Sequence, residues 1–530
     1  YNYEAKYYRD LTAANDGLLS EDLSDFNLAK GTTNFTLNGG RNEYAIMGWF
    51  YRAAYDYKGK YLAEVNGRYD GTSRFPRGKR YGFFPSFSAA YRISEEAFFE
   101  PLRKTVDNLK IRLSYGSLGN QQIGYYDFIQ TITTKGSMGD YSFDGTILGQ
   151  HATVSDPVSG NQTWEKVISK NLGADLNMFS NRLSLTADFY IRDTKGILGK
   201  GKSLPSIYGA NEPQVNSNNL RTKGYELVLG WRDSFKLAGS TFSYGITGTF
   251  SDYTAEYTKC DNPSGLIGDP YVGKKYGEIW GYKVDGLFRN DEEAAEYASR
   301  VDLSKVAAGY YSATGAYGKG VRGGDIKYLD LDGSGIVDGG KGTLEDPGDR
   351  RVIGNSSPRY QYGLTLNLSW YGFDLSVFMQ GIGRLDWYPG ADNLRFWGPY
   401  SRPYATFIPK NFMSQVWSES NPDAYLPRAR AYTSLNSTQG TAYYTNDRYL
   451  QNLAYCRLKN LTLGYTIPKR LTSKVGIKEC RVYFSGENLA TWSALKNDFL
   501  DPEQAAADSD KKSNVYPWCR TYSVGLNLTF

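Results

Sequence analysis

The sequence predicts an all-β protein, a transmembrane antiparallel β-barrel with short turns at one end and long loops at the other. About a dozen segments alternate apolar and polar residues with a period of two. Many of them begin or end on Tyr, Trp or Phe, as membrane-interface girdles require, and the chain is 15% aromatic with 46 Tyr. Short and long connections also alternate along the chain, which is the rule for membrane barrels.

The carboxy-terminal segment is the clearest strand. Residues 522–530 place small or polar residues on one face and apolar residues on the other without an error. A single strand of this kind also fits the edge of a soluble sandwich, but the strand lengths, the aromatic strand ends and the asymmetry of the connections decide against that. Outer-membrane barrels end on a strand that has an apolar face and an aromatic last residue. We therefore expect the apolar face of residues 522–530 to be the barrel-terminus signal. That face consists of Tyr522, Val524, Leu526, Leu528 and Phe530.

The remaining strands are expected to be roughly ten residues long, which suits a tilted membrane crossing. A further strand that contains Tyr1, Tyr3, Ala5 and Tyr7 brings the total to about 13 or 14 in one domain, 1–530. The expected ranges are 44–57, 60–70, 83–93, 109–118, 171–178, 183–192, 224–232, 241–250, 359–370, 373–380, 455–467, 481–489 and 522–530.

The connections divide into two classes. The short ones include 58–59, 179–182, 233–240 and 371–372. The long ones include 119–170, 193–223, 381–454 and 490–521, and the longest, 251–358, is expected to be a large extracellular loop within the barrel. A soluble Greek-key protein has no reason to keep all its short turns on one side.

Composition excludes several other classes of protein. Mean hydropathy is −0.53 and no run of about 18 apolar residues occurs, so any membrane crossing is made by strands. The net charge of +5 over 530 residues is too dilute for nucleic acid binding. The single histidine, His151, and the four cysteines lack catalytic or metal-binding spacing, so we expect no enzyme, no catalytic residues and no obligatory disulfide.

Several blocks in order along the chain resemble the SusC/RagA-type TonB-dependent transporters of the Bacteroidetes outer membrane. The resemblance implies an integral outer-membrane importer of a large nutrient, an oligosaccharide or a peptide, that works with a SusD-like lipoprotein lid and the TonB complex. It also implies a 22-stranded barrel, so we expect this chain to be the carboxy-terminal part, without plug and signal peptide. The blocks include Asp56-Tyr-Lys-Gly-Lys-Tyr-Leu62, Gly67-Arg-Tyr-Asp-Gly-Thr-Ser-Arg-Phe75, Gly281-Tyr-Lys-Val-Asp-Gly-Leu-Phe288, Gly323-Gly-Asp-Ile-Lys-Tyr328 and Phe484-Ser-Gly-Glu-Asn-Leu489.

An acidic motif in the longest loop has the spacing of a calcium loop. Asp330, Asp332 and Ser334 stand at positions 1, 3 and 5, Gly335 turns the chain at 6, Ile336 offers its carbonyl at 7, and Asp338 stands at 9. Lys341 replaces the usual Glu at position 12, so Glu345 or Asp346 is a candidate for the missing ligand. The alternatives are a bound Ca²⁺ or Mg²⁺ and an acidic turn without a cation.

Two further groups of residues are candidates for binding. The 381–454 loop carries aromatic residues that no lipid-facing alternation explains, and they either stack on a ligand or form the loop's own core. Four basic residues in the 71–81 loop, Arg74, Arg77, Lys79 and Arg80, either bind an anion or face water. The aromatic candidates for ligand contact are Trp387, Tyr388, Trp397 and Tyr400.

Two alternatives to the importer remain at this point. One is a secreted carbohydrate-active β protein, either a hydrolase or a glycan-binding module, whose aromatic residues stack on sugars. Such a hydrolase needs two carboxylates at a set separation, and no local motif supplies them. The other lies within the class of importing barrels, as siderophore or vitamin uptake or as passive diffusion. For the importer, we expect the long outer loops to dock the lid lipoprotein.

Overall fold

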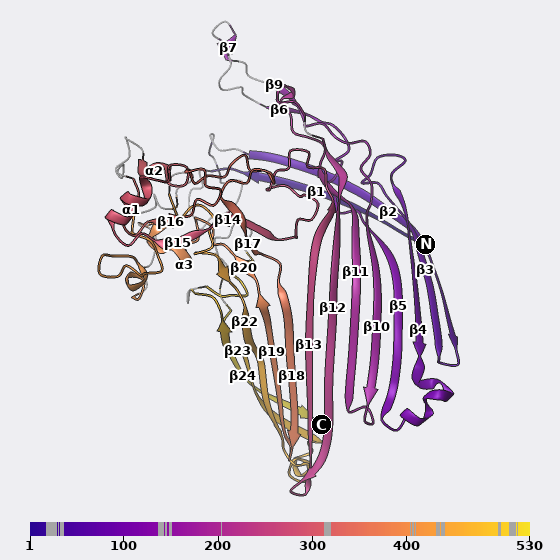
Figure 1. Ribbon diagram of the computed structural model, residues 1–530. Coiled ribbons are helices and arrows are strands. Elements are labelled where there is room, and N and C mark those ends of the chain that lie inside the picture. Colours follow the sequence, from indigo (N-terminus) through magenta and orange to yellow (C-terminus); the bar gives the residue numbers. More distant parts are fainter. Residues whose placement is uncertain are drawn as a thin grey trace. The chain divides into compact units, whose positions relative to one another are not determined.

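A computed structural model shows a single large antiparallel sheet with small elements gathered in the loops at one end of its strands (Figure 1). It describes residues 1–16, 29, 31, 36–135, 142–143, 146–147, 151–202, 204–311, 320–402, 404, 408, 410–430, 435, 440–496, 500–507, 516 and 518–530. The sheet has 14 strands, and every strand pairs with its sequence neighbour within it. The predicted fold class and the number of strands are confirmed.

The strands of the sheet follow the chain in simple up-and-down order. They are β1 (Asn2–Ala14), β2 (Thr36–Tyr57), β3 (Tyr61–Thr72), β4 (Tyr81–Arg92), β5 (Val106–Asn120), β10 (Glu165–Met178), β11 (Leu183–Lys200), β12 (Gln214–Leu237), β13 (Ser240–Lys259), β18 (Arg359–Trp370), β19 (Phe373–Arg384), β22 (Tyr455–Thr466), β23 (Glu479–Ser493) and β24 (Thr521–Thr529).

Tight turns join the strands at one end. Tyr371 and Gly372 have φ of 49° and 83°, and Lys58 and Gly59 have φ of 57° and 66°. Two consecutive residues with positive φ are the type I′ pattern, whose twist matches that of the flanking strands. The connection expected over 233–240 is shorter than predicted, because β12 continues to Leu237 and only two residues remain for the turn.

The strand register agrees with the apolar and polar faces predicted for β18. Leu366 of β18 lies opposite Ile246 of β13 and Val377 of β19, so three apolar residues share one face. One position away, Thr365 lies opposite Thr247 on the other face. Because side chains alternate along a strand, a shift of one residue would exchange the two faces completely. The apolar face is therefore the one that meets lipid.

Most strands are longer than the alternation predicts, and most of the extra residues lie at the long-loop end. β12 begins at Gln214 instead of 224, β13 ends at Lys259 instead of 250, and β2 begins at Thr36 instead of 44. Beyond the hydrocarbon layer both faces meet water or loops, so backbone pairing continues where the apolar alternation has stopped.

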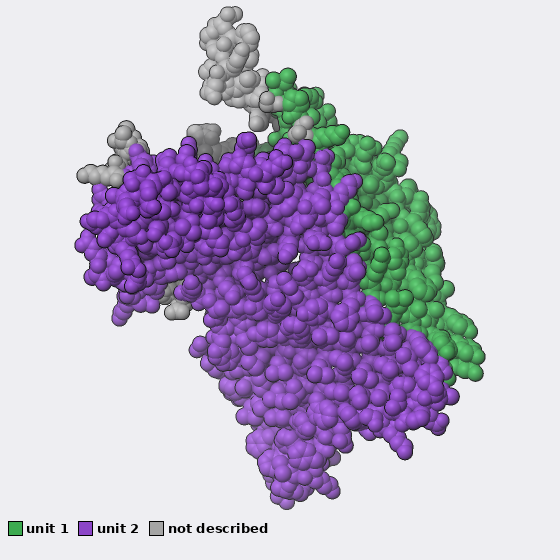
Figure 2. All heavy atoms as spheres, viewed as in Figure 1, with its two compact units in different colours: residues 1–90, 112–171, 192–220 green, residues 91–111, 172–191, 221–530 purple. Residues whose placement is uncertain are grey.

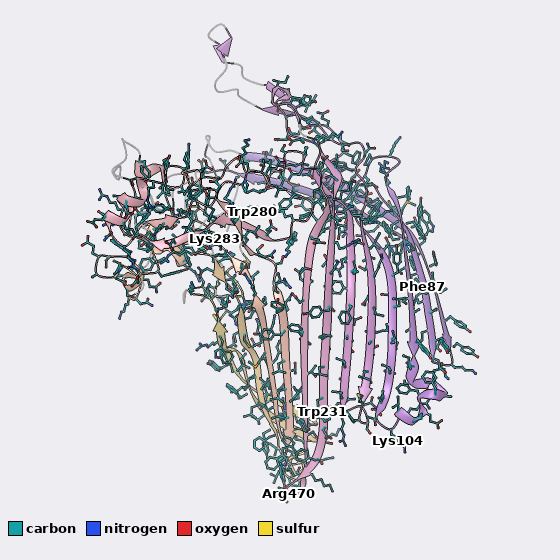
Figure 3. The ribbon with its side chains drawn as sticks, in the orientation of Figure 1. Phe87, Lys104, Trp231, Trp280, Lys283 and Arg470 are labelled. Atoms are coloured by element: carbon teal, nitrogen blue, oxygen red, sulfur yellow. The ribbon has the colours of Figure 1, made fainter. Side chains whose placement is uncertain are left out.

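The chain divides into two compact units, which Figure 2 distinguishes by colour. Unit 1 comprises residues 1–90, 112–171 and 192–220, and unit 2 comprises 91–111, 172–191 and 221–530. Within unit 2, Lys104, Trp231 and Arg470 lie at the short-turn end, whereas Trp280 and Lys283 lie among the loops (Figure 3).

The loops of unit 2 contain small elements of their own. Asn290 caps α1, because its side chain accepts a hydrogen bond from the Glu293 N–H. No helix among the described residues is long and apolar enough to cross a membrane. The elements are β14 (Glu278–Tyr282), β15 (Val284–Leu287), α1 (Asp291–Ala298), α2 (Ala308–Tyr311), β16 (Ile326–Tyr328), β17 (Arg350–Asn355), β20 (Asp386–Trp387), α3 (Leu394–Trp397) and β21 (Gln451–Asn452).

The remaining short elements lie outside that group. The strands are β6 (Ile132–Lys135), β7 (Ser142–Phe143), β8 (Thr146–Ile147) and β9 (His151–Val154), and within the described ranges the one further α-helix is α4 (Lys469–Thr472). Single 3₁₀ turns span Ile93–Glu95, Ala97–Leu102, Ser206–Tyr208, Gly398–Tyr400, Met413–Gln415 and Ser473–Val475.

A charge on the lipid-facing side should be much more harmful than one on the polar side of the same strand. We expect Leu366→Arg to cost about 2–4 kcal/mol near the bilayer midplane and to abolish assembly. The matched control, Thr365→Lys on the adjacent polar face, should be tolerated. Heat-modifiable migration on a gel measures the folded fraction, and equal losses from both variants would contradict the assignment of the faces.

Candidate functional site

The long loops of unit 2 pack around one aromatic core, here called the loop core. Its members come from three connections that are distant in sequence, 260–358, 385–454 and 494–507. Burial of many large side chains supplies the stabilisation that a loop of this length otherwise lacks. The loop core includes Phe288, Leu303, Tyr310, Ile326, Tyr328, Trp387, Phe396, Trp397, Trp417, Leu426, Tyr449, Leu453 and Leu500.

The aromatic residues predicted to contact a ligand lie within this core. Trp387, Tyr388, Trp397 and Tyr400 are 4%, 7%, 0% and 2% exposed. The Tyr388 hydroxyl donates to the Tyr444 carbonyl at 3.0 Å and the Tyr400 hydroxyl to the Pro427 carbonyl at 2.5 Å. This packing favours the alternative that the rings form the loop's own core, and ligand stacking by these four residues stays a prediction.

Polar links fix the loops to one another inside the core. Arg430 donates two hydrogen bonds to the carboxylate of Asp325, at 3.0 and 2.5 Å, and both side chains are buried. The Arg430 guanidinium also lies 4.1 Å from the centre of the Tyr310 ring. A buried charge needs such a partner, because an unpaired one would cost several kcal/mol. The pair therefore joins residues 105 positions apart in the chain.

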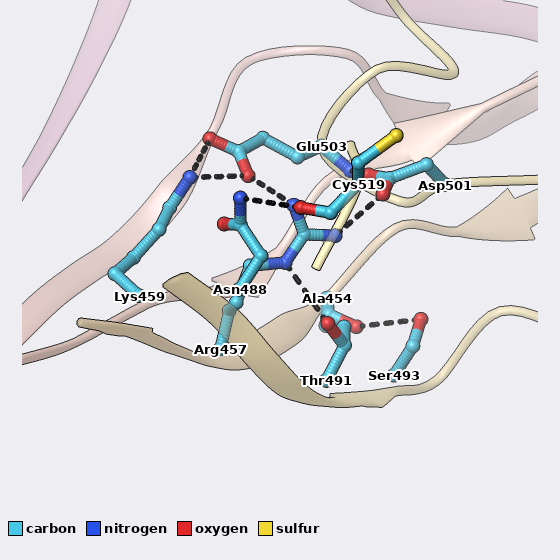
Figure 4. A network of polar contacts seen from close by, with 9 residues as sticks. All are labelled: Ala454, Arg457, Lys459, Asn488, Thr491, Ser493, Asp501, Glu503 and Cys519. Carbon is cyan, nitrogen blue, oxygen red and sulfur yellow. Dashed lines mark hydrogen bonds and ion pairs between the residues drawn. The ribbon is translucent and has the colours of Figure 1, made fainter. Parts of the chain in front are cut away.

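A second network attaches the last long loop to the sheet (Figure 4). Arg457 of β22, which is 2% exposed, donates to Asp501 at 2.6 Å, to Glu503 at 2.7 Å and to the Thr491 hydroxyl at 2.9 Å. Lys459 of the same strand donates to Glu503 at 2.7 Å. Two cations thus hold two carboxylates of the loop against the strand, with all partners in hydrogen-bond contact.

The acidic turn brings three carboxylates together. Oxygen atoms of Asp330, Asp332 and Asp349 all lie within 4.8 Å of one another. Two ligands on opposite sides of Ca²⁺, each at about 2.4 Å, would be about 4.8 Å apart, so the spacing fits this ion. Among the described residues this is the one group of three or more potential metal ligands.

Of the predicted ligands, Asp330 and Asp332 belong to the group of three carboxylates, and the full ligand set stays a prediction. Gly335 makes the expected turn, with φ of 79°, and the Ser334 hydroxyl donates to the Ile336 carbonyl at 3.0 Å. The carboxylate of Asp338 accepts the Gly340 N–H at 2.7 Å and lies outside the three-carboxylate group. Neither Glu345 nor Asp346 belongs to that group either. The third carboxylate is Asp349, which the sequence reasoning missed.

Asp349 lies at the centre of the turn. Its carboxylate accepts hydrogen bonds from the backbone N–H groups of Leu331, Asp332 and Asp338, at 2.6, 3.3 and 2.9 Å. Burial raises the pKa of the Asp349 carboxyl, whereas hydrogen bonds from Ser334 lower the pKa of Asp332. No sequence motif identifies Asp349, because this residue directly precedes β17 and lies beyond the span of the calcium-loop spacing.

Charges on the polar face of the sheet pair with one another. Arg52 and Glu64 are 2.8 Å apart in unit 1, and Arg359 and Asp252 are 2.6 Å apart in unit 2. A cavity of about 790 Å³ opens on this face of unit 2, with Arg182, Arg232, Asp233 and several Ser and Asn residues in its wall. The polar face is therefore wet and charge-balanced, unlike the core of a soluble sandwich.

The predicted terminal strand is present as β24, which pairs with β23 through Thr529 opposite Glu479 and Thr521 opposite Glu487. Its apolar side chains remain exposed on the lipid-facing side, from Leu528 at 40% to Val524 at 79%. His151 lies in β9, opposite Lys135. The four cysteines are free thiols.

These features define an outer-membrane β-barrel protein: long antiparallel strands, an apolar face toward lipid, a polar face toward water, and turns and loops at opposite ends. The family described as TonB dependent receptor-like, beta-barrel, matches residues 1–489, and the chain belongs to this family. Proteins of the family are integral to the bacterial outer membrane, as predicted.

Named relatives agree with the resemblance seen in the sequence. TonB-dependent receptor P3 of Formosa agariphila is 26% identical, over 100% of this chain and 50% of its own length. TonB-dependent receptor SusC of Bacteroides thetaiotaomicron is 23% identical, over 92% and 44%. A solved structure of the RagAB peptide importer has a TM-score of 0.73 at 20% identity, over 100% of this chain and 52% of its own. The chain thus spans about half the length of the relatives it matches.

Truncation of a buried ring should destabilise the loop core. Trp397→Ala removes a fully buried side chain whose ring centre lies 5.0 Å from that of Tyr449. We expect a loss of about 3–5 kcal/mol in the unfolding free energy of the loop core, measured by limited proteolysis. Tyr404→Ala in the same loop, at a side chain 81% exposed, should change it by less than about 0.5 kcal/mol. Equal protease resistance of the two variants would contradict a structural role for Trp397.

Proposed function

We propose that the complete protein imports a large nutrient across the outer membrane and takes its energy from the TonB complex. The observation that carries this proposal is the ordered loop core at one end of a membrane-spanning sheet. A channel that merely lets small solutes diffuse has no need of more than a hundred residues packed into a separate core. Membership of the TonB-dependent receptor family supports the same function.

A SusD-like surface lipoprotein is the partner we propose for the outer loops. A lid protein needs a surface that keeps its shape while the lid opens and closes. The loop core provides rigidity, since Arg430–Asp325 and the Arg457 network fix its loops to each other and to β22. The SusC relative and the likeness in fold to RagAB support a partner of this type.

The proposed substrate is an oligosaccharide, which the resemblance to SusC-type transporters favours. A peptide is the second candidate, because the solved structure of similar fold is titled a peptide importer. Both substrates are too large for simple diffusion through a narrow pore. Growth of a strain that lacks the gene, on single glycans and on peptides as sole nutrient, separates the two. Loss of growth on peptides alone would replace the oligosaccharide proposal, and normal growth on every nutrient would contradict import.

We also propose that the acidic turn holds a Ca²⁺ or Mg²⁺ ion, with Asp330, Asp332 and Asp349 as ligands. The spacing of the three carboxylates fits a divalent ion, and hard cations prefer oxygen ligands. The ion would balance negative charge at a turn in which Ile336 forms an isolated β-bridge with Asp302. It would serve to hold the loop in shape for the lid, without a chemical step.

Replacement of two ligands tests this role. We expect Asp330→Ala with Asp332→Ala to remove the bound ion and to weaken copurification of the lipoprotein, while the barrel stays folded. Elemental analysis of the purified complex measures the ion, and gel migration measures the barrel. A matched control, Glu292→Ala with Glu345→Ala, removes two exposed carboxylates elsewhere in the same loop and should change neither. If the ligand variant keeps both ion and partner, the cation proposal is wrong.

A further inference from the structure

The basic loop between β3 and β4 lies directly beyond the aromatic girdle of unit 1. Four rings form a row across β1 to β4: Tyr1 and Trp49 are 5.5 Å apart, Trp49 and Tyr69 6.2 Å, and Tyr69 and Tyr81 5.4 Å. Tyr and Trp rings prefer the boundary between hydrocarbon and headgroups. The row therefore marks the headgroup level on the side of the β3–β4 loop.

A cavity of about 160 Å³ opens at this level, and its wall includes Tyr3, Ala45, Met47, Gly71, Arg80 and Tyr81. The register pairs Tyr3 with Met47 and Met47 with Gly71. These residues lie on the same face as Trp49 and Tyr69, which is the lipid-facing side. A cavity of this size holds an apolar group about as large as benzene.

The wall of the cavity includes two donors for an anion, Ser73 and Arg80. The Arg80 Nε donates to the Phe75 carbonyl at 3.0 Å, which fixes the guanidinium there. The Ser73 hydroxyl accepts the Ala45 N–H at 2.9 Å and keeps its own proton for a further bond. Arg77 and Lys79 are exposed on the same loop, and within the described residues no carboxylate pairs with Arg77, Lys79 or Arg80.

The loop is held in shape from beneath. The Thr72 N–H donates to the Arg80 carbonyl at 3.1 Å, and the Trp164 Nε1 donates to the same carbonyl at 2.9 Å. Phe75, Phe84 and Trp164 form a small buried cluster under the loop. The backbone that bears these cations is therefore already ordered, so binding does not cost the entropy of ordering the loop.

We propose that this site binds a phosphate-bearing lipid of the surrounding bilayer. Arg80, Lys79 and Arg77 would contact the phosphate, and the cavity would take an apolar part of the same lipid. Guanidinium groups suit phosphate because they donate two parallel hydrogen bonds, and clusters of basic residues beside a membrane attract anionic lipids. Charge complementarity favours a lipid with a net negative headgroup, and the position on the lipid-facing side favours the bilayer over bulk solution as its source.

Native mass spectrometry of the full-length protein, purified in detergent and stripped of lipid, tests this proposal with phosphatidylglycerol as the probe. The wild-type protein should retain this lipid more tightly than uncharged phosphatidylcholine. Lys79→Gln with Arg80→Gln should weaken its binding on the order of tenfold. Ala45→Leu, which fills the cavity without a change in charge, should also weaken it.

The control variant, Arg300→Gln with Lys341→Gln, removes two exposed cations from the loops of unit 2 and should bind the lipid like wild type. Gel migration checks that each variant is folded, and if the Lys79 and Arg80 variant does not fold, the exposed Arg77→Gln variant carries the test with an expected loss of about threefold. Equal lipid binding by the wild-type protein and the variant with Lys79→Gln and Arg80→Gln overturns the proposal. Displacement of the lipid by millimolar inorganic phosphate overturns it too, because the site would then serve a soluble anion.

Discussion

The pairing of backbone groups inside the bilayer is the constraint on which the rest of this structure depends. Hydrocarbon offers no partner for an N–H or a C=O, so every strand that crosses must be bonded along both edges by other strands. This requirement explains the uninterrupted up-and-down order of the 14 strands and the tight turns at 58–60 and 371–372. It also leaves the side chains free to differ, with apolar groups toward lipid and paired charges such as Arg52–Glu64 toward water.

Different interactions stabilise the loop core. In the loops, water satisfies backbone groups, and the structure depends instead on buried aromatic side chains and a few buried ion pairs. Arg457 shows how the two regions are joined: its backbone belongs to the β22 ladder, while its guanidinium holds Asp501 and Glu503 of the last loop. A single residue thus transmits the rigidity of the sheet to a segment more than forty positions away. For a protein proposed to carry a lid, such anchoring keeps the outer surface in one shape.

Local spacing pointed to two of the three clustered carboxylates but not to the third, and the cation site itself stays a prediction. Asp330 and Asp332 were found because a calcium loop has a fixed spacing, and Gly335 takes the predicted positive φ. Asp349 has no fixed spacing to them, since the loop that returns it can be of any length. The aromatic residues of 381–454 were recognised as unusual, but composition alone does not distinguish a ring that stacks on a ligand from Trp397, which is fully buried. Burial depends on what other loops contribute, and those loops are distant in sequence.

The sequence by itself determined the fold class, the face of each strand and the side on which the short turns lie. The physical reason is that lipid on one face requires apolar residues at every second position of a membrane-spanning strand. Each strand therefore carries this alternation in its own sequence, and it can be recognised without the other strands. Only the tertiary structure decided how far the strands extend beyond the membrane, which loops share the aromatic core, which carboxylate completes the acidic turn, and where Arg80 meets a cavity. Those features arise from contacts between distant segments, and no local pattern encodes the partner of a contact.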